Sequence, residues 1–367
     1  MPKIFISAGE PSGDIHAAKL MLAIQRLNPD VEFVGIGGSE MEKAGLKSII
    51  PISEISVVGF WEVAKKYTLF MQLQKQCEAI LRSGEIDVFV PIDYPGFNMR
   101  LAAAAKSQKI PVVYYIAPQL WAWGKNRTRK IAKNTDKLLA VFPFEEEFFR
   151  KEGINAKFVG HPLLDIPEFQ GEFLKFDDRN NSIALFPGSR DQEVHKHIDL
   201  LLDTAKILHS ELPNYDILIA KSQNISESFF ADKIKDKKYI NVSNTPRQLM
   251  LNSKVGIIKS GTSNLEACLA GLPFSMYYKT SFFTYFMGKR IINIDYLSII
   301  NILSGKQVIN EYIQDDATPA KLADATLRLL NEPKAYSDLQ EEFVKLKALL
   351  GNSGASENAA REIIEIL

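Results

Sequence analysis

The residue best suited to proton transfer in this sequence is Asp93, which follows an apolar run. The segment "DVFVPIDYPGFN", residues 87–98, predicts a buried strand that ends at a Pro-Gly turn. A carboxylate at the carboxyl end of a parallel strand lies at the edge of the sheet where ligands bind, and can take a proton from a hydroxyl group there. The alternative is that Asp93 is a turn residue bonded to its own backbone.

A second group of residues is suited to binding phosphate. The segment "ALFPGSR", residues 184–190, predicts a buried strand that ends in Gly188, Ser189 and Arg190. Glycine allows close approach of the backbone, serine can donate a hydrogen bond, and the guanidinium fork of arginine matches phosphate oxygens. The alternative is an ordinary strand-to-helix turn whose arginine forms a surface ion pair.

The segment "VGIIKSGTSNLEACLAG", residues 255–271, repeats this pattern. Gly261, Thr262 and Ser263 open a predicted helix, whose free N–H groups and dipole attract anions. Glu266 follows one turn later, where its carboxylate can reach ribose hydroxyls. The alternative is a capping box, in which these side chains only cap the helix. Two phosphate-suited turns in one domain favour a nucleoside diphosphate.

The first loop of the chain and an aromatic-basic segment are candidates for binding a sugar. The loop "ISAGEPSGD", residues 6–14, carries Glu10 and Ser12 but matches neither the dinucleotide nor the triphosphate glycine pattern. Residues 114–133, "YYIAPQLWAWGKNRTRKIAK", combine Gln119 and Trp121 with several basic side chains, which suits a sugar ring or an anionic headgroup. The alternative is that the tryptophans pack in the core and the basic side chains cover a solvated helix face.

Two apolar stretches combine aromatic and basic residues in the way typical of a membrane interface. They are "SVVGFWEVAKKYTLFM", residues 56–71, and "YYKTSFFTYFMGKR", residues 277–290. Burial in the core is the alternative for any single aromatic residue there.

Composition limits the classes of protein to consider. The 367 residues are 46% hydrophobic and 24% charged, as in folded globular proteins, and the formal net charge is zero, unlike that of a strongly basic nucleic-acid binder. The two cysteines form no disulfide or metal pattern, and the sequence shows neither an export signal nor an apolar run long enough to span a bilayer. We therefore expect a cytoplasmic protein without bound metal. A lone histidine beside a proline, such as His161, is more often structural than catalytic, and the alternative is a functional role near the hinge between the domains.

Short β-rich runs alternate with helical patterns along the chain, which predicts an α/β protein with parallel sheets. The acidic, irregular stretch "DIPEFQGEFLKFDDRNNS", residues 165–182, is the predicted linker between two Rossmann-like domains. The expected domains are residues 1–165 and 166–345, and residues 346–367 are expected to form a terminal helix that returns to the first domain. A ligand is expected in the cleft that the two domains face.

Eight motifs together resemble the bacterial lipid-A-disaccharide synthase family. In chain order they are "SAGEPSGD", "GIGGSEM", "VVGFWEV", "IDYPGFN", "YYIAPQLWAW", "FVGHPL", "LFPGSR" and "SGTSNLE". The resemblance runs nearly from end to end. It implies an inverting, metal-independent glycosyltransferase of the two-Rossmann-domain (GT-B) type. Such an enzyme joins UDP-2,3-diacylglucosamine to 2,3-diacylglucosamine 1-phosphate, releasing UDP and the β-1,6-linked disaccharide of lipid A.

The resemblance also implies roles for individual residues. Asp93 matches the proposed general base, Arg190 the arginine at the UDP phosphates, Glu266 the carboxylate at the ribose, and Asn301 an asparagine at the donor site. The first domain then binds the acceptor, which Glu10 and Ser12 contact across from the nucleotide on the second domain. No cofactor or nucleic acid is expected. Peripheral association with the cytoplasmic leaflet of the inner membrane and a homodimer are expected.

Two other functions use the same residues differently. A UDP-N-acetylglucosamine 2-epimerase, or another UDP-sugar glycosyltransferase, would share the nucleotide-binding half, because a fold does not fix a function. A sugar-nucleotide-binding regulator would bind UDP without turnover, and then Asp93 would not be needed as a base.

Overall fold

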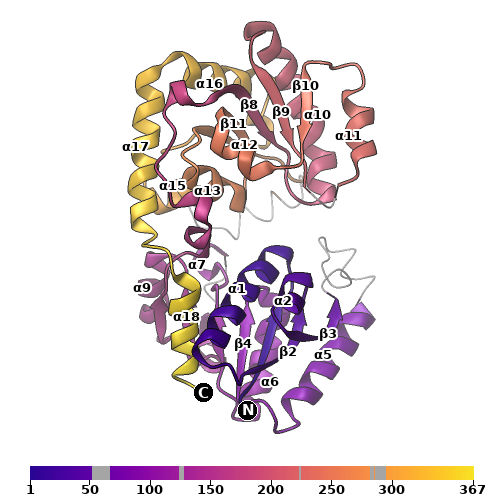
Figure 1. Cartoon of the computed structure of the whole chain (residues 1–367), viewed down its shortest axis with the longest axis vertical. Helices are drawn as coiled ribbons and strands as arrows, with labels where there is room; N and C mark the ends of the chain where they lie inside the picture. Colours follow the sequence, from indigo (N-terminus) through magenta and orange to yellow (C-terminus); the bar gives the residue numbers. More distant parts are fainter. Residues whose placement is uncertain (52–66, 124–127, 223–224, 282–284, 286–294) are drawn as a thin grey trace. The chain divides into compact units, whose positions relative to one another are not determined.

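The computed structural model describes residues 1–51, 67–123, 128–222, 225–281, 285 and 295–367 (Figure 1). The chain divides into two compact units. Unit 1 comprises Met1–Ile166 and Leu350–Leu367, and unit 2 comprises Pro167–Leu349. Both ends of the chain therefore belong to unit 1. The sequence had suggested divisions after residues 165 and 345.

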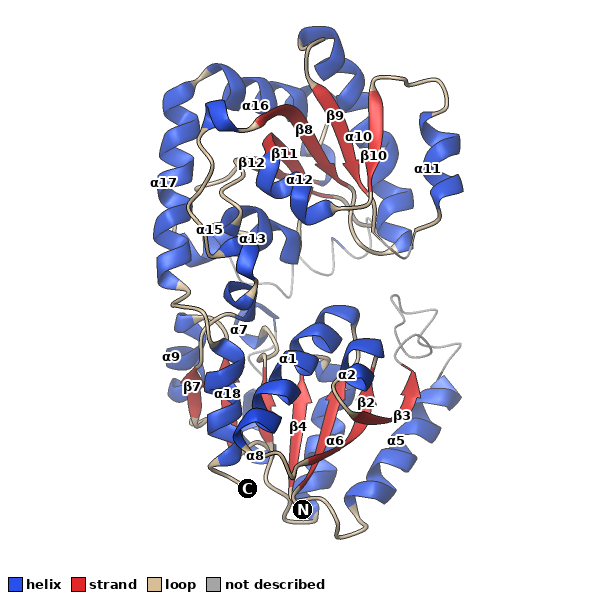
Figure 2. Ribbon diagram, in the orientation of Figure 1, coloured by secondary structure: helices blue, strands red, loops and turns tan. Residues whose placement is uncertain are grey.

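Unit 1 is a parallel sheet with helices on its two faces (Figure 2). Its strands are β1 (Lys3–Ala8), β2 (Glu32–Gly37), β3 (Leu46–Pro51), β4 (Val88–Ile92), β5 (Val113–Tyr115), β6 (Lys137–Ala140) and β7 (Ala156–Phe158). Its helices are α1 (Pro11–Leu27), α2 (Ser39–Lys43), α5 (Tyr67–Leu81), α6 (Pro95–Ser107), α7 (Leu120–Trp123), α8 (Thr128–Asn134), α9 (Pro143–Lys151), the 3-10 turn η2 (Pro162–Asp165) and α18 (Ala355–Ile364).

Unit 2 repeats this architecture. Its strands are β8 (Asn180–Phe186), β9 (Asp216–Ala220), β10 (Ile240–Ser243), β11 (Ser253–Lys259), β12 (Phe274–Tyr278) and β13 (Glu311–Ile313). Its helices are α10 (Asp191–Glu211), α11 (Glu227–Ile234), α12 (Pro246–Asn252), α13 (Thr262–Leu269), α15 (Ile299–Ser304), α16 (Pro319–Asn331), α17 (Pro333–Leu349) and the 3-10 turns η3 (Pro167–Phe169), η4 (Phe176–Asp178) and η5 (Gln314–Asp316).

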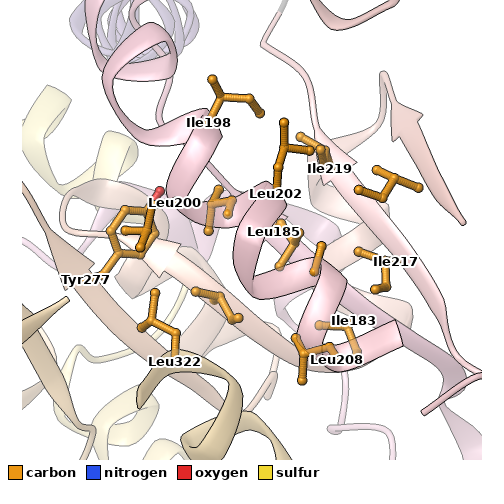
Figure 3. Close-up of a cluster of buried hydrophobic side chains, with 14 of the residues drawn as sticks. Ile183, Leu185, Ile198, Leu200, Leu202, Leu208, Ile217, Ile219, Tyr277 and Leu322 are labelled. Atoms are coloured by element: carbon orange, nitrogen blue, oxygen red, sulfur yellow. The ribbon is translucent and has the colours of Figure 1, made fainter. Parts of the chain in front are cut away.

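The apolar runs of the sequence form the buried strands, as expected for parallel sheets covered on both faces. In unit 2, Ile183 and Leu185 of β8 and Ile217 and Ile219 of β9 are fully buried, and Leu208 of α10 packs against the same cluster (Figure 3). Burial of each such side chain contributes about 1.5–3 kcal/mol to stability. Helix α10 is therefore fixed to the sheet, and the loop that precedes it is fixed with it.

The order of the strands determines where a ligand can bind. The described strands of unit 1 run β3-β2-β1-β4-β5-β6-β7, and those of unit 2 run β10-β9-β8-β11-β12-β13. The chain reverses its direction of travel across the sheet between β1 and β4 in unit 1, and between β8 and β11 in unit 2. Ligands of open α/β sheets bind at the carboxyl ends of the strands beside such a reversal.

The predicted linker, residues 165–182, is not an irregular connection over most of its length. From Pro167 onward it belongs to unit 2 and forms η3, η4 and the start of β8. Phe169 and Arg179 are both buried. The Arg247 guanidinium lies 5.7 Å from the centroid of the Phe169 ring, and Arg179 donates to backbone carbonyls of unit 2 such as that of Ala270. Because residues 165–182 are mostly polar, their sequence does not predict this packing.

The last helix, α18, packs against α1 in unit 1. The carboxylate of Asp165 accepts hydrogen bonds from the backbone N–H groups of Gly354, Ala355 and Ser356 at 2.6–3.1 Å, and one from the Ser356 hydroxyl at 2.9 Å. A carboxylate that satisfies the free N–H groups at the start of a helix stabilises it. Asp165 thus attaches the end of the chain to unit 1.

Candidate functional site

The reversal in unit 2 brings the two predicted phosphate-binding turns together. Strands β8 and β11 pair in parallel, with Phe186 opposite Ile258, so the turns that follow them leave the same edge of the sheet side by side. The first turn carries Gly188, Ser189 and Arg190, and the second carries Gly261, Thr262 and Ser263.

Gly188 is required by the geometry of the first turn. Its φ of 123° lies in the region that favours glycine, and a Cβ built there would lie 2.7 Å from Oε2 of Glu193. The backbone N–H of Ser189 donates to the same Glu193 oxygen at 3.3 Å. The turn after β8 thus packs closely against the carboxylate of Glu193.

Two basic side chains, those of Lys259 and Arg190, also bind the Glu193 carboxylate. Lys259 Nζ lies 2.8 Å and Arg190 Nη1 3.2 Å from Oε1 of Glu193. Burial of Glu193 raises its pKa, but Lys259 and Arg190 outweigh burial and hold the pKa below its ordinary value. Sequence reasoning missed Lys259 and Glu193. The available signal was that Lys259 ends an apolar strand, immediately before the predicted phosphate-binding turn.

The start of α13 contradicts the capping-box alternative. Gly261 is the N-cap residue, no side chain caps this described helix end, and Thr262 and Ser263 already lie within the first turn of the helix. Gly261 has no side chain that could accept a hydrogen bond, so the first N–H groups of α13 lack the usual side-chain acceptor. This helix start retains its attraction for an anion.

Glu266 lies in α13, partly buried. Burial raises the pKa of its carboxyl group, and the positive charge of Arg247 on α12 opposes that rise. Its position one turn into α13 is the one that the sequence predicted.

The side-chain amide of Asn301 forms its hydrogen bonds with other residues of unit 2. It is fully buried in α15; its Nδ2 donates to the Ile309 carbonyl and to Glu311, and its Oδ1 accepts from Val308 N and Ile309 N, all at 2.7–3.0 Å. These four bonds use both donors and both acceptor positions of the amide. Asn301 thus fixes the fold of residues 308–311.

The reversal in unit 1 brings the first loop of the chain next to Asp93. A Cβ at Gly9 would lie 2.3 Å from the ring of Tyr94, so only glycine fits at this position. Burial and the nearby carboxylate of Glu10 raise the pKa of Tyr94 to about 12. The loop after β1 and the turn after β4 are therefore in contact.

The backbone at Asp93 has an uncommon conformation that its neighbours hold in place. Asp93 and Tyr94 have φ values of 43° and 50°, in the left-handed region that non-glycine residues seldom adopt. The Asp93 carbonyl accepts from Asn98 Nδ2 at 2.8 Å and from the Tyr114 hydroxyl at 2.7 Å, and its N–H donates to the Tyr115 carbonyl at 3.2 Å. Such strain clusters at functional sites. The Asp93 side chain is half-buried at the strand edge.

The other residues of the first loop differ in exposure. Glu10 is the N-cap of α1 and is half-buried, whereas Ser12 is exposed in the first turn of that helix. Asp14 is buried and its carboxylate accepts from Gly38 N at 2.8 Å and Met41 N at 3.0 Å. Asp14 therefore holds the turn after β2, while Glu10 and Ser12 follow the carboxyl end of β1.

The aromatic-basic segment contributes Gln119 and Trp121. Gln119 is exposed in the turn after β5, and Trp121 donates from Nε1 to the Glu145 carboxylate at 3.1 Å. Glu145 is buried, and burial raises its pKa to about 7, although bonds from Trp121 and from two backbone N–H groups oppose the rise. The nearby carboxylate of Asp93 adds slightly to the rise of this pKa.

Three further sequence predictions concern His161, bound metal and the membrane-interface stretches. His161 is buried and its Nδ1 accepts from Leu163 N at 3.2 Å, which caps η2, and burial lowers its pKa to about 3. Within the described ranges, no group of three His, Cys, Asp or Glu side chains could hold a metal ion. The predicted membrane-interface stretches fall largely on residues 52–66, 282–284 and 286–294, outside the described residues.

Comparison with protein-family models and comparison with known protein sequences point to the same family. A family model described as lipid-A-disaccharide synthetase matches residues 4–364. The chain is 36% identical to a lipid-A-disaccharide synthase from Persephonella marina over 383 residues, which covers 100% of this chain and 99% of that protein. It is 34% identical to one from Geobacter metallireducens, covering 100% and 97% of the two chains.

Comparison with solved structures shows the fold. A UDP co-structure of S. aureus MnaA matches with a TM-score of 0.67 at 13% identity, covering 100% of this chain and 98% of that one. UDP-GlcNAc 2-epimerase from Neisseria meningitidis bound to UDP-GlcNAc gives 0.64 at 14% identity, and the glycotransferase of kitacinnamycin gives 0.63 at 15%, each covering 100% and 99% of the two chains. The predicted two-domain α/β fold of the GT-B type is confirmed.

Proposed function

Since this chain belongs to the lipid-A-disaccharide synthase family and is thus a glycosyltransferase of lipid A biosynthesis, we propose its substrates and the roles of its residues. The proposed donor is UDP-2,3-diacylglucosamine and the proposed acceptor is 2,3-diacylglucosamine 1-phosphate. The products are UDP and the β-1,6-linked disaccharide 1-phosphate. The observation that carries the proposal is the set of residues at the two chain reversals. In unit 2, two neighbouring turns bring the positive charge of Arg190 to the edge of the sheet. In unit 1, the Asp93 carboxylate lies on a strained turn.

The donor's diphosphate binds at the turns after β8 and β11 in this proposal. Gly188 and Ser189 offer close backbone approach, Arg190 offers charge, and Thr262 and Ser263 begin the helix whose N-terminus is directed at the anion. Glu266 accepts hydrogen bonds from the ribose hydroxyls. The saturated amide of Asn301 acts indirectly, by fixing the segment around Glu311.

The acceptor binds at the carboxyl edge of the sheet in unit 1. Asp93 takes the proton of the acceptor 6-hydroxyl, and the resulting alkoxide oxygen attacks the anomeric carbon of the donor. The bond from that carbon to the diphosphate oxygen breaks, its electron pair leaves with UDP, and the configuration at the anomeric carbon inverts. Glu10, Ser12, Gln119 and Trp121 supply polar and aromatic contacts to the acceptor sugar.

Both proposed substrates carry acyl chains, so the proposal includes contact with the cytoplasmic leaflet of the inner membrane. In the part of the chain that the structure describes, no helix is long and apolar enough to cross a bilayer. A homodimer belongs to the proposal as well.

Acceptor-dependent UDP release tests the proposal directly. Purified protein in mixed micelles with the donor, with and without the acceptor, is expected to release UDP only when the acceptor is present, and addition of a chelator should not change the rate. UDP release or C2 epimerisation that does not depend on the acceptor would support the epimerase alternative. Donor binding without turnover would support the regulator.

A further inference from the structure

The carboxylate of Glu193 occupies a position built to hold an anion. Its two oxygens accept from the Ser189 backbone N–H at 3.3 Å, from Arg190 Nη1 at 3.2 Å and from Lys259 Nζ at 2.8 Å. These donors come from the turn after β8 and from the end of β11. A backbone N–H and two cations at neighbouring strand ends are the groups that also bind phosphate.

Lys259 lies between the two turns. Its side chain is 13% exposed and that of Glu193 is 18% exposed, so water screens this ion pair less than a surface pair. The ammonium group lies 5.8 Å from the ring centroid of Tyr278, and a Cβ built on Gly261 would lie 3.8 Å from Nζ. An anion held at the start of α13 would therefore meet the Lys259 ammonium group.

We propose that Lys259 is a ligand of the donor's diphosphate, and that the diphosphate displaces Glu193 from Lys259, Arg190 and the Ser189 amide. The inference rests on the proposed function, because it adds residues to the same donor site. Before the nucleotide binds, Glu193 holds both cations in place and balances part of their charge. After it binds, Lys259 stabilises the negative charge that develops on the leaving diphosphate.

The test compares the affinities of UDP and uridine in single variants of the full chain. Lys259→Met is expected to weaken UDP binding by about tenfold or more, as for the loss of a charge-assisted hydrogen bond, and to leave uridine binding unchanged. Lys259→Arg keeps the positive charge and is expected to retain most of the UDP affinity. Calorimetry measures UDP binding, and saturation-transfer NMR measures uridine binding.

Lys221→Met is the matched control. Lys221 follows β9 at the same edge of the sheet, its side chain is 11% exposed, and its Nζ lies 4.0 Å from the Glu227 carboxylate. The control variant is expected to bind UDP like the original protein. If it weakens UDP binding as much as Lys259→Met does, the effect is one of general charge and the inference is wrong.

Glu193→Gln separates displacement from a purely structural role. Loss of the competing carboxylate is expected to tighten UDP binding by about three- to tenfold, because the diphosphate no longer has to break these ion pairs. Weaker UDP binding in this variant, or unchanged UDP binding in Lys259→Met, would overturn the inference while leaving the proposed function intact. Absence of UDP binding to the original protein would instead overturn both.

Discussion

At the scale of single residues, the Asp93 carboxylate is expected to act as a base, and its unusual backbone determines how this can be tested. Asp and Asn both tolerate a positive φ, so Asp93→Asn should preserve the turn, whereas alanine would add backbone strain. We expect Asp93→Asn to reduce the turnover rate by about 10²–10⁴-fold, because proton transfer from the acceptor hydroxyl loses its base. Acceptor-dependent UDP release measures this rate.

UDP affinity is the internal control for that variant, because the proposed nucleotide site lies in unit 2 and should be unaffected. Asp30→Asn, an exposed acid of the same unit, is the matched control and should keep full activity. Full turnover in Asp93→Asn would show that another group accepts the proton.

Glu145 predicts a pH dependence of stability. The folded protein holds its pKa at about 7, whereas the ordinary value is 4.5, so the folded state binds more protons than the unfolded state between these values. Its contribution to the free energy of unfolding is therefore fully present below pH 4.5 and is lost as pH rises towards 7. The slope is at most about 1.4 kcal/mol per pH unit.

Glu145→Gln should remove this slope, which urea unfolding at several values between pH 5 and pH 8 can measure. Buried His16 and His161, whose pKa values are lowered, contribute the opposite slope, so the comparison is between variant and original protein. Glu147→Gln, which alters an exposed acid on the same helix, is the control and should leave the slope unchanged. An unchanged slope in Glu145→Gln would mean that Glu145 is already ionised at pH 5.

At the scale of elements, the start of α18 is capped by one carboxylate from a distant part of the chain, that of Asp165. Asp165→Ala removes the acceptor of three backbone N–H groups and a hydroxyl at the start of this helix. We expect the opening free energy of α18 to fall by about 1–2 kcal/mol, as for loss of a helix cap. Hydrogen exchange of residues 355–364 should accelerate accordingly.

Glu365→Gln, which alters an exposed acid just beyond the end of the same helix, is the control and should change exchange little. If exchange in α18 were unaffected by Asp165→Ala, the packing of α18 on α1 would suffice to hold it.

The elements also show how far the sequence predicts the structure. Strands with continuous apolar runs, such as β4 and β11, were predicted, because burial on both faces leaves a clear pattern. The edge strand β13 was missed, since its three residues are only partly buried and bear no such pattern. The two phosphate-suited turns were predicted from residue types. Lys259 and Glu193 were missed, because they are 66 residues apart in sequence and their contact depends on the pairing of β8 with β11.

At the scale of the whole molecule, each unit has its own sheet and its own core. The hydrogen bonds of the Arg179 side chain all lie within unit 2. It is buried, and its guanidinium donates to backbone carbonyls near the ends of α12 and α13 and before η4, namely those of Leu174, Met250, Leu251, Ser253, Ala270 and Gly271. Arg179→Met would leave these acceptors unpaired and should destabilise unit 2 by about 3–5 kcal/mol. Chemical denaturation would measure the loss, and Arg328→Met, at an exposed ion pair of the same unit, should lose less than about 1 kcal/mol.

The division into two units also predicts where UDP stabilises the chain. If the nucleotide binds at the turns after β8 and β11, UDP at about 100 times its Kd should protect amides of unit 2 by up to about 2.7 kcal/mol. The strongest protection is expected in residues 187–194 and 260–266, where backbone N–H groups meet the diphosphate. Arg190→Ala should weaken this protection at equal UDP concentration while leaving the exchange of the free protein nearly unchanged, because Glu193 retains Lys259 as its partner. Protection confined to unit 1 would instead place the nucleotide beside Asp93 and reverse the assignment of donor and acceptor.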